Sequence, residues 1–284
     1  MLQKIKGKTL TMKRYVSCLT IAGSDPSGGA GIEADLKTFA ALGVYGMAVI
    51  TAVTAQNTLG VRSSFALPAD VVEAQAEAVF DDLNPQYVKI GMTADINIIC
   101  VLSRLLRKYS PKFVVLDPVV VSTSGHKLIE DSAIEAMKRE LLPLVSVVTP
   151  NLPESAVLAD CGELRTLEEA EACGRRILAR GCKAVLVKGG HFESSPDSSD
   201  LLLAQGFSRT YAMPRVKTQN THGTGCTLSS AIAAYSARGC GLAEAVGEAK
   251  HYLHEALQAG ADVKVGEGHG PVNHFFRPCK QLFE

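Results

Sequence analysis

The feature that most constrains the fold is the alternation of short apolar runs with longer helical patterns along the chain. The apolar runs are rich in β-branched residues and are bounded by polar residues or glycine, as strands buried on both faces are. They cover residues 16–22, 48–55, 87–90, 113–116, 146–148 and 184–187. Strands that alternate with helices in this way predict an α/β fold with a mainly parallel central sheet and helices on both faces.

Helical spacing of apolar residues fills the intervals between these strands and continues after the last one. The predicted helices span residues 32–42, 70–82, 96–108, 132–142, 153–159, 167–179, 225–238 and 242–259. Gly43, Gly181 and Gly239 each follow a helix, where a left-handed glycine cap is expected. Since no linker divides the chain, residues 13–284 are predicted to form one domain, preceded by a flexible extension of residues 1–12.

A short ribbon is predicted late in the chain. Residues 201–203 and 210–213 are two apolar stretches on either side of Gly206, which indicates an antiparallel pair. The polar stretch 193–200 before them predicts an exposed loop. This loop and residues 122–127 are candidates to close over a bound ligand.

Composition argues against several classes of function. Lys plus Arg and Asp plus Glu both number 29, so we expect no surface for nucleic acid or an anionic membrane. No apolar run approaches the ~18 residues of a membrane span. The run after the basic N-terminus is short and contains Ser17 and Thr20, which indicates a strand and not a signal peptide. The eight cysteines form no C-x-x-C pair, so we expect reduced, mostly buried thiols, neither zinc nor disulfides, and a cytoplasmic protein.

The segment 220–227, NTHGTGCT, joins a glycine-rich turn to a helix full of small residues. The first N–H groups of a helix have no partner within it, and glycines allow a ligand to approach the backbone closely. The amides of Gly223, Thr224, Gly225 and Cys226 are therefore predicted to form an anion hole for a phosphoryl group. The alternative is an ordinary helix start with a threonine cap.

Cys226 lies in the first turn of that helix. The helix dipole favours a thiolate there, so we expect its pKa to fall below the usual value of about 8.5 and the sulfur to accept a hydroxyl proton. The alternative is a small buried apolar residue.

A second glycine-rich stretch, residues 23–31, separates the first strand from the first helix. Part of it fits G-x-G-x-x-A, so a dinucleotide-binding dehydrogenase is one interpretation. The turn is long for that motif, and no acidic residue ends the second strand to bind a ribose. We expect the turn to bring Asp35 against a small substrate, although Asp35 could equally be a surface acid near a helix N-terminus.

Polar side chains follow the next strands at their carboxyl ends, where open parallel sheets bind ligands. Asp117 follows one strand, and the segment from Thr149 through Asn151 to Glu154 follows the next. Asp117 and Glu154 are predicted to organise Mg²⁺ through water, and Thr149 and Asn151 to contact the nucleotide. Asn151 also suits a helix cap before Pro153, and both roles can hold at once.

Lys188 ends a further strand before two glycines and is predicted to neutralise ATP phosphates; the alternative is a lysine that extends to solvent. We expect His191 and His222 to be hydrogen-bonded polar residues and not metal ligands. The chain contains no Walker A pattern, which argues against a P-loop fold.

Taken in order, these segments resemble the hydroxymethylpyrimidine/phosphomethylpyrimidine kinases of thiamine synthesis, which belong to the ribokinase superfamily. The matching stretches are residues 20–32, 34–38, 54–58, 89–92, 117–119, 149–154, 188–191, 221–226 and 268–272. The resemblance implies a ribokinase-like three-layer α/β/α fold, ATP and Mg²⁺ as cofactors, and a homodimer. It also implies that Gln56 and Asp35 bind the pyrimidine nitrogen and amino groups, with Gly23 and Met92 lining the pocket. The wider superfamily has aspartate as base where Cys226 stands.

The expected activity is therefore ATP-dependent phosphorylation of 4-amino-5-hydroxymethyl-2-methylpyrimidine to the monophosphate and then to the diphosphate. A pyridoxal or pyridoxine kinase is the alternative within the same fold, and a non-catalytic pyrimidine sensor is the alternative from another class. Because Cys226, Lys188, Asp117 and Glu154 occur together, catalysis is favoured over binding alone.

Overall fold

The computed structural model describes the chain except for residues 1–2, 6–7, 11, 94, 121–128 and 191–196. Its centre is a nine-stranded sheet in the order β11-β10-β9-β8-β7-β6-β3-β4-β5. Strands β3, β4 and β6 to β9 are parallel, whereas β5, β10 and β11 pair antiparallel at the two edges. The strands are β3 (Ser17–Ser24), β4 (Tyr45–Asn57), β5 (Gly60–Ala66), β6 (Tyr87–Ile90), β7 (Phe113–Leu116), β8 (Val147–Val148), β9 (Ala184–Lys188), β10 (Asp197–Ala204) and β11 (Phe207–Pro214).

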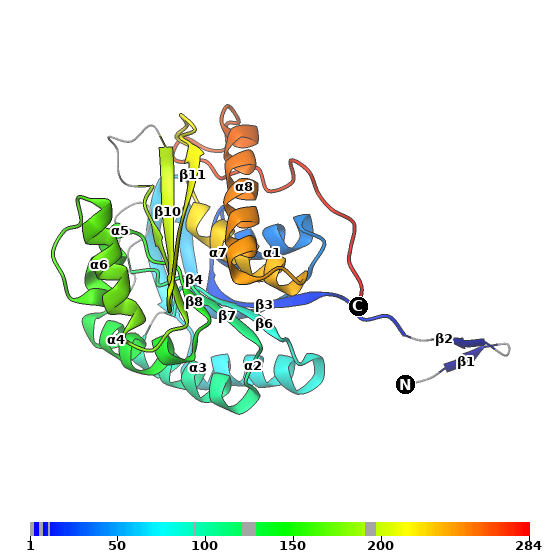
Figure 1. Ribbon diagram of the computed structural model, residues 1–284. Coiled ribbons are helices and arrows are strands. Elements are labelled where there is room, and N and C mark those ends of the chain that lie inside the picture. The colour runs from blue at the N-terminus through cyan, green and yellow to red at the C-terminus, as the bar shows by residue number, and fades with distance from the viewer. Residues whose placement is uncertain (1–2, 6–7, 11, 94, 121–128, 191–196) are drawn as a thin grey trace.

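Helices cover both faces of the sheet and make three layers (Figure 1). One face carries α1 (Gly31–Ala41), α7 (Thr224–Ala237) and α8 (Leu242–Gly260). The other carries α2 (Ala69–Leu83), α3 (Ile96–Tyr109), α4 (Asp131–Ala136), α5 (Leu152–Ala159) and α6 (Leu167–Leu178). Successive β7 residues alternate between the two cores, since Val114 and Leu116 pack in one and Val115 in the other. Strands buried on both faces account for the continuous apolar runs in the sequence.

The predicted α/β/α architecture with a mainly parallel sheet is confirmed, and four details differ. β5 was not predicted, because its sequence is largely polar and it lies at a sheet edge. The predicted helix 132–142 is instead α4 followed by a π-helical turn, η1 (Met137–Leu141), and a 3₁₀ turn, η2 (Leu142–Leu144). Pro143 has no N–H to continue an α-helix there.

The predicted loop 193–200 was wrong in its second half, since β10 begins at Asp197 and Asp200 pairs with Lys188. The apolar stretches 201–203 and 210–213, which were predicted to form an antiparallel pair, are parts of two longer strands, β10 and β11.

The turn glycines behave as predicted: Gly43, Gly181 and Gly239 all have positive φ. At the N-terminus, β1 (Gln3–Ile5) and β2 (Lys8–Leu10) form an antiparallel hairpin that Figure 1 draws beyond the start of β3. Residues 122–127 and 193–196, two candidate closing segments, and His191 lie outside the described residues.

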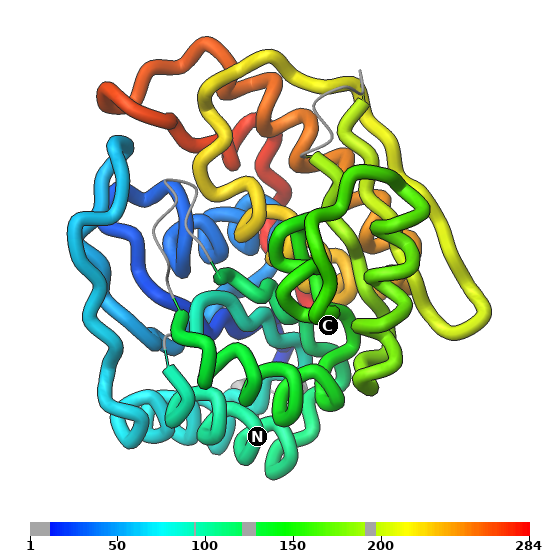
Figure 2. The backbone as a smooth tube through the Cα atoms, turned by 90° about the vertical axis from the view of Figure 1, so that its left-hand side faces the viewer, coloured from blue at the N-terminus to red at the C-terminus, as the bar shows by residue number. Residues whose placement is uncertain are grey.

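The tail of the chain returns to the edge of the sheet. In Figure 2 the orange-red segment after α8 lies near the light-blue tip of the β4–β5 hairpin. The His269 N–H donates to the Thr58 carbonyl at 3.0 Å, and the His222 N–H donates to the Gly270 carbonyl at 3.1 Å. The tail therefore connects the β4–β5 hairpin to the turn before α7.

Candidate active site

A cavity of about 700 Å³ opens at the carboxyl edge of the parallel strands. It is bounded by the turn after β3, the ends of β4, β7 and β9, and the start of α7. Most of the residues predicted for the site line it: Gly23, Gln56, Met92, Asp117, Asn151, Glu154, Lys188, Gly223, Thr224, Gly225 and Cys226. Asp35 and Thr149, also predicted for the site, are not among the lining residues. The strand ends thus bring together segments that are far apart in the sequence, as open parallel sheets do.

The start of α7 is a backbone turn that only glycine fits. Gly223 is the N-cap, with φ of 77°, and a side chain there would overlap the carbonyl oxygen of Gly29. The cap is therefore a glycine and not the threonine that was the alternative. Gly225 lies beside the charged groups, because an added Cβ would be 3.4 Å from both Asp117 Oδ2 and Lys188 Nζ. The start of α7 consequently lies beside the part of the cavity where Lys188 and Asp117 meet.

The prediction of a lowered Cys226 pKa was wrong. Burial raises the pKa of the Cys226 thiol to about 11, although the Lys89 ammonium and a hydrogen bond with the Gly31 backbone lower it in part. The carboxylates of Asp35 and Asp117 add to the increase. Desolvation therefore outweighs the helix dipole, and the sulfur at neutral pH is a thiol.

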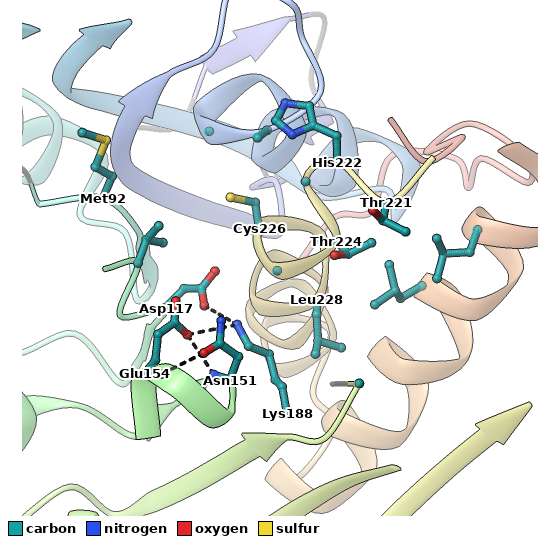
Figure 3. A pocket seen from close by; sticks show the side chains of 18 of the residues that line it. Met92, Asp117, Asn151, Glu154, Lys188, Thr221, His222, Thr224, Cys226 and Leu228 are labelled. Carbon is teal, nitrogen blue, oxygen red and sulfur yellow. Dashed lines mark hydrogen bonds and ion pairs between the residues drawn. The ribbon is translucent and has the colours of Figure 1, made fainter. Parts of the chain in front are cut away.

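Lys188 lies close to two carboxylates, those of Asp117 and Glu154, in the wall of the cavity (Figure 3). Its Nζ lies 2.8 Å from Asp117 Oδ1 and 3.9 Å from Glu154 Oε2. Burial disfavours the charge on Lys188, but the two carboxylates outweigh it and raise its pKa. The alternative of a lysine extended into solvent is thus wrong, because the Lys188 side chain is only 15% exposed.

The pKa values of the two carboxylates shift in opposite directions. Burial raises the pKa of Asp117, but Lys188, Lys89 and a Thr149 hydroxyl at 3.1 Å lower it below its usual range. For Glu154 burial prevails over Lys188, and its pKa rises to about 7. Thr149 is fully buried, is not among the residues that line the cavity, and positions Asp117. Its predicted contact with a nucleotide stays a prediction.

Asn151 and Glu154 form a capping box at the start of α5. The Glu154 N–H donates to Asn151 Oδ1 and the Asn151 N–H donates to Glu154 Oε2, both at 2.8 Å. Both roles predicted for Asn151 remain open to it, since it caps the helix and also lines the cavity. The box fixes the Glu154 carboxylate with one oxygen committed to the backbone.

Asp117 and Glu154 suit a magnesium ion that takes its other ligands from water and phosphate. The described residues contain no group of three His, Cys, Asp or Glu side chains that could enclose a metal. Asp117 and Glu154 lie on either side of Lys188, and both line the cavity. One or two carboxylates with water and phosphate completing the shell is the usual arrangement for Mg²⁺ at nucleotide sites. The donor set therefore suits an ion that arrives with a nucleotide, and not a resident all-protein site.

The other end of the cavity is apolar with a few hydrogen-bonding groups. Gly23 leaves room for Met92, whose sulfur would be 3.1 Å from a Cβ at that position. Gln56 lines the same end, with Thr54 Oγ1 3.2 Å from its Oε1. An amide beside a thioether and a bare backbone can bind the face and edge of a small heteroaromatic ring.

His222 and Asp25 also belong to the site, and sequence reasoning gave neither a site role. His222 Nε2 lies 2.7 Å from Asp25 Oδ2 and 3.3 Å from Gln56 Nε2. Burial raises the pKa of Asp25, but hydrogen bonds from His222 and Ser27 outweigh it and lower the value to about 2. His222 is thus a hydrogen-bonded polar residue, as predicted, and it links the turn after β3 to the start of α7. The sequence feature that could have indicated this pair was Asp25, the acidic residue in the glycine-rich stretch 23–31.

Asp35 lies in a buried network of hydrogen bonds. Its side chain is fully buried, and Oδ2 accepts from Lys89 Nζ at 2.8 Å and from Thr20 Oγ1 at 2.6 Å. Oδ1 accepts from Ser230 Oγ at 2.6 Å. Both oxygens are therefore occupied, and the residue is buried and not the surface acid that was the alternative. Asp35 is not among the residues that line the cavity, and its predicted contact with the pyrimidine stays a prediction.

Two further findings bear on the class of protein. Among the described residues, no helix has the length and apolar character needed to cross a membrane. In the turn after β3, Gly31 has φ of 57°, and a side chain there would overlap the Gly23 carbonyl. This glycine is needed for the tight approach of two backbone segments.

Comparison with known proteins agrees with this architecture. Residues 25–273 match the family model described as phosphomethylpyrimidine kinase. A Salmonella typhimurium protein named hydroxymethylpyrimidine/phosphomethylpyrimidine kinase is 50% identical over 260 residues, which cover 92% of this chain and 97% of that protein.

Solved structures give the same result. A phosphomethylpyrimidine kinase from Clostridium difficile superposes with a TM-score of 0.75 at 44% identity, covering 85% of this chain and 99% of that one. A Bacillus subtilis pyridoxal kinase in an ADP complex superposes with a TM-score of 0.85 at 32% identity, covering 92% and 97%. The family model spans most of the chain, and the similarity to the Salmonella protein spans nearly all of both proteins. The chain therefore belongs to the phosphomethylpyrimidine kinase family.

Proposed function

We propose that this protein transfers the γ-phosphoryl group of ATP to the hydroxymethyl oxygen of 4-amino-5-hydroxymethyl-2-methylpyrimidine, and then a second phosphoryl group to the resulting monophosphate, in thiamine biosynthesis. The names of its relatives support the substrate, and kinases of similar fold are described with ADP. Catalysis of this kind depends mainly on positioning and charge stabilisation.

One observation carries the proposal: a single cavity is lined both by Gln56, Met92 and Gly23 and by the start of α7 with Lys188. We assign the first group to a ring-binding end and the second to a phosphoryl-binding end. Cys226 lies between them in Figure 3. A hydroxymethyl group on a ring held at the first end would point its oxygen toward the second.

The roles of the residues follow from their charges. The amides of Gly223, Gly225 and Cys226 donate to the phosphoryl oxygens as charge develops on them. The Thr224 N–H, also predicted for this role, donates instead to the Thr221 carbonyl at 3.3 Å. Lys188 neutralises the phosphate chain, and Asn151 contacts the nucleotide from the start of α5. When bound, Mg²⁺ supplies positive charge to the phosphates, and Asp117 and Glu154 would hold it, in part through water.

Proton transfer involves Cys226. As the new O–P bond forms and the bond to ADP breaks, the hydroxymethyl oxygen loses its proton. The Cys226 sulfur accepts this proton only as a thiolate, which its pKa of about 11 makes a minor form at neutral pH. Because phosphoryl transfer is loose and the proton leaves late, a minor thiolate can still serve.

A pyridoxal or pyridoxine kinase is the second candidate, because solved pyridoxal kinases superpose on this chain with TM-scores of 0.85 and 0.83. The two activities use the same phosphoryl end and differ in the ring that is held. Sequence identity favours the pyrimidine, at 50% to the Salmonella protein and 32% to the Bacillus pyridoxal kinase.

We further propose that the protein is a cytoplasmic homodimer whose residues 13–284 form one kinase domain. The homodimer rests on resemblance to the family. The single nine-stranded sheet, which includes segments from Ser17 to Pro214, supports one domain.

The decisive experiment measures ADP release from Mg-ATP with 4-amino-5-hydroxymethyl-2-methylpyrimidine, with pyridoxal and without substrate. A higher kcat/KM on the pyrimidine is expected, and Gln56→Ala should raise its KM more than it lowers kcat. A higher kcat/KM on pyridoxal would instead show a pyridoxal kinase. Tight pyrimidine binding without ADP release would show a sensor.

A further inference from the structure

Two cysteines lie in contact away from the cavity. Cys161 follows α5 and Cys173 lies within α6, and their sulfur atoms are 2.9 Å apart. Cys173 is only 2% exposed, whereas Cys161 is partly buried. Neither residue lines the active-site cavity. Their separation of 12 residues fits no C-x-x-C pattern, so the sequence predicted only isolated thiols.

The backbone holds each cysteine in place. Asp160 ends α5 in a left-handed conformation with φ of 51°, and the Cys161 N–H donates to the Ala156 carbonyl at 3.0 Å. The Cys173 thiol donates to the Ser155 carbonyl at 3.1 Å. Lys138 binds the Asp160 carboxylate at 2.5 Å. Cys161, in the connection after α5, is thus held by a backbone hydrogen bond to α5, and Cys173 is held by a hydrogen bond from its thiol to Ser155 of α5.

Only one of the two sulfurs can be reached from outside. A second cavity of about 290 Å³ lies between α4 and α5, and Cys161 lines it together with Lys138, Asp160 and Val157. Cys173 is absent from that lining. Burial, followed by its contact with Cys161, raises the pKa of the Cys173 thiol. The accessible sulfur is thus the first to react, and the buried sulfur can react only with its neighbour.

We propose that Cys161 and Cys173 are a dithiol site that forms a reversible disulfide with a small-molecule disulfide such as oxidised glutathione. The Cys161 thiolate attacks one glutathione sulfur, the glutathione S–S bond breaks, and a mixed disulfide forms as one glutathione leaves. Cys173 then loses its proton and attacks the Cys161 sulfur, which releases the second glutathione. The protein loses two electrons and two protons, and oxidised glutathione becomes two reduced molecules.

The two sulfurs are already in contact in the reduced fold. They lie 2.9 Å apart, and a disulfide joins its sulfurs at about 2.05 Å. The bond would join the end of α5 to α6, whereas the other end of α5 carries Asn151 and Glu154 at the active site. Oxidation therefore restrains a helix that contributes to the phosphoryl end of the cavity.

The test incubates the full chain in glutathione buffers of increasing oxidised-to-reduced ratio, quenches the thiols with an alkylating reagent and maps the peptides. We expect Cys161 and Cys173 to escape alkylation together, and a linked pair of peptides to appear. Cys161→Ser should abolish that link. Cys279→Ser, which removes an exposed thiol, should leave it unchanged.

Thermal unfolding gives a second readout. The oxidised wild-type chain should melt roughly 5 °C above its reduced form, since the bond closes a loop of the unfolded chain. Cys161→Ser should melt at one temperature in both buffers. The proposal is overturned if Cys161 and Cys173 stay alkylatable at a ratio that converts Cys279 to a mixed disulfide, if either links to another cysteine, or if oxidation lowers the melting temperature. The wild-type peptide map decides the matter even if the variant does not fold.

Discussion

Lys89 and Asp35 form an ion pair that is sealed from solvent, with 2.8 Å between Nζ and Oδ2 and no exposed area on either side chain. Removing one partner of such a pair leaves an uncompensated buried charge, which costs far more than loss of a surface pair. We expect Asp35→Asn to lower the free energy of unfolding by about 3–5 kcal/mol in urea titrations.

The control for that prediction is Glu73→Ala, which breaks the exposed pair with Arg104. It should cost less than about 1 kcal/mol. If Asp35→Asn leaves stability unchanged and only raises the KM for the pyrimidine, Asp35 is a substrate ligand after all.

Gly223→Ala should impair catalysis, because a Cβ would overlap the Gly29 carbonyl and displace the amides that follow. We expect kcat to fall by about 10²–10³, the usual cost of losing an oxyanion donor. Steady-state kinetics with saturating ATP and pyrimidine measures it.

Gly239→Ala is the matched control. Gly239 also has positive φ, at 97°, but no atom lies within 4 Å of its added Cβ. It should lose about 1 kcal/mol of stability and keep its kcat. Equal losses of kcat in both variants would contradict a specific role for the turn before α7.

The pH dependence of kcat should report on Cys226. Because burial raises the thiol pKa to about 11, the thiolate fraction grows about tenfold per pH unit below that value. If the thiolate accepts the proton, kcat rises with pH between about 8 and 10 in the wild type. Cys226→Ala should be slower and lack this slope. A wild-type profile that is flat across that range would show that the sulfur acts only as a neutral thiol.

Asp25 should make stability sensitive to acid. Its pKa is lowered from 3.8 to about 2 in the folded protein, so the unfolded chain binds the proton more readily. The resulting stabilisation, about 2 kcal/mol, is fully present above pH 4 and is lost as the pH falls through 2. Urea titrations between pH 5 and 3 should show a shallower decline for Asp25→Asn than for wild type; parallel declines would contradict this.

The parallel strands were predictable because they are buried on both faces and therefore read as uninterrupted apolar runs. The edge strand β5 was not, since Arg62, Ser63 and Ser64 face partners or solvent that the sequence does not reveal. The sequence also does not show which strands pair or in which register. Thr20 of β3 lies opposite Lys89 of β6, and this register places the Lys89 ammonium beside Asp35.

The sequence predicted which residues line the active-site cavity better than it predicted their burial and their charge. Strand ends located Asp117, Glu154 and Lys188, because a parallel sheet collects its carboxyl termini at one edge. The charge state of Cys226 depends on how much solvent its neighbours exclude, which is a property of packing. Thr149 is buried and is not among the residues that line the cavity, which is likewise a property of packing.

The approach of Gly223 to Gly29 also sets the order in which the molecule can become competent during synthesis. The ribosome releases the turn after β3 early, but its partner before α7 emerges only after all nine strands of the sheet have been made. A nascent chain can therefore assemble much of its sheet while the amides proposed to bind phosphate are still missing. The start of α7 is the last of the groups proposed to bind phosphate to be synthesised.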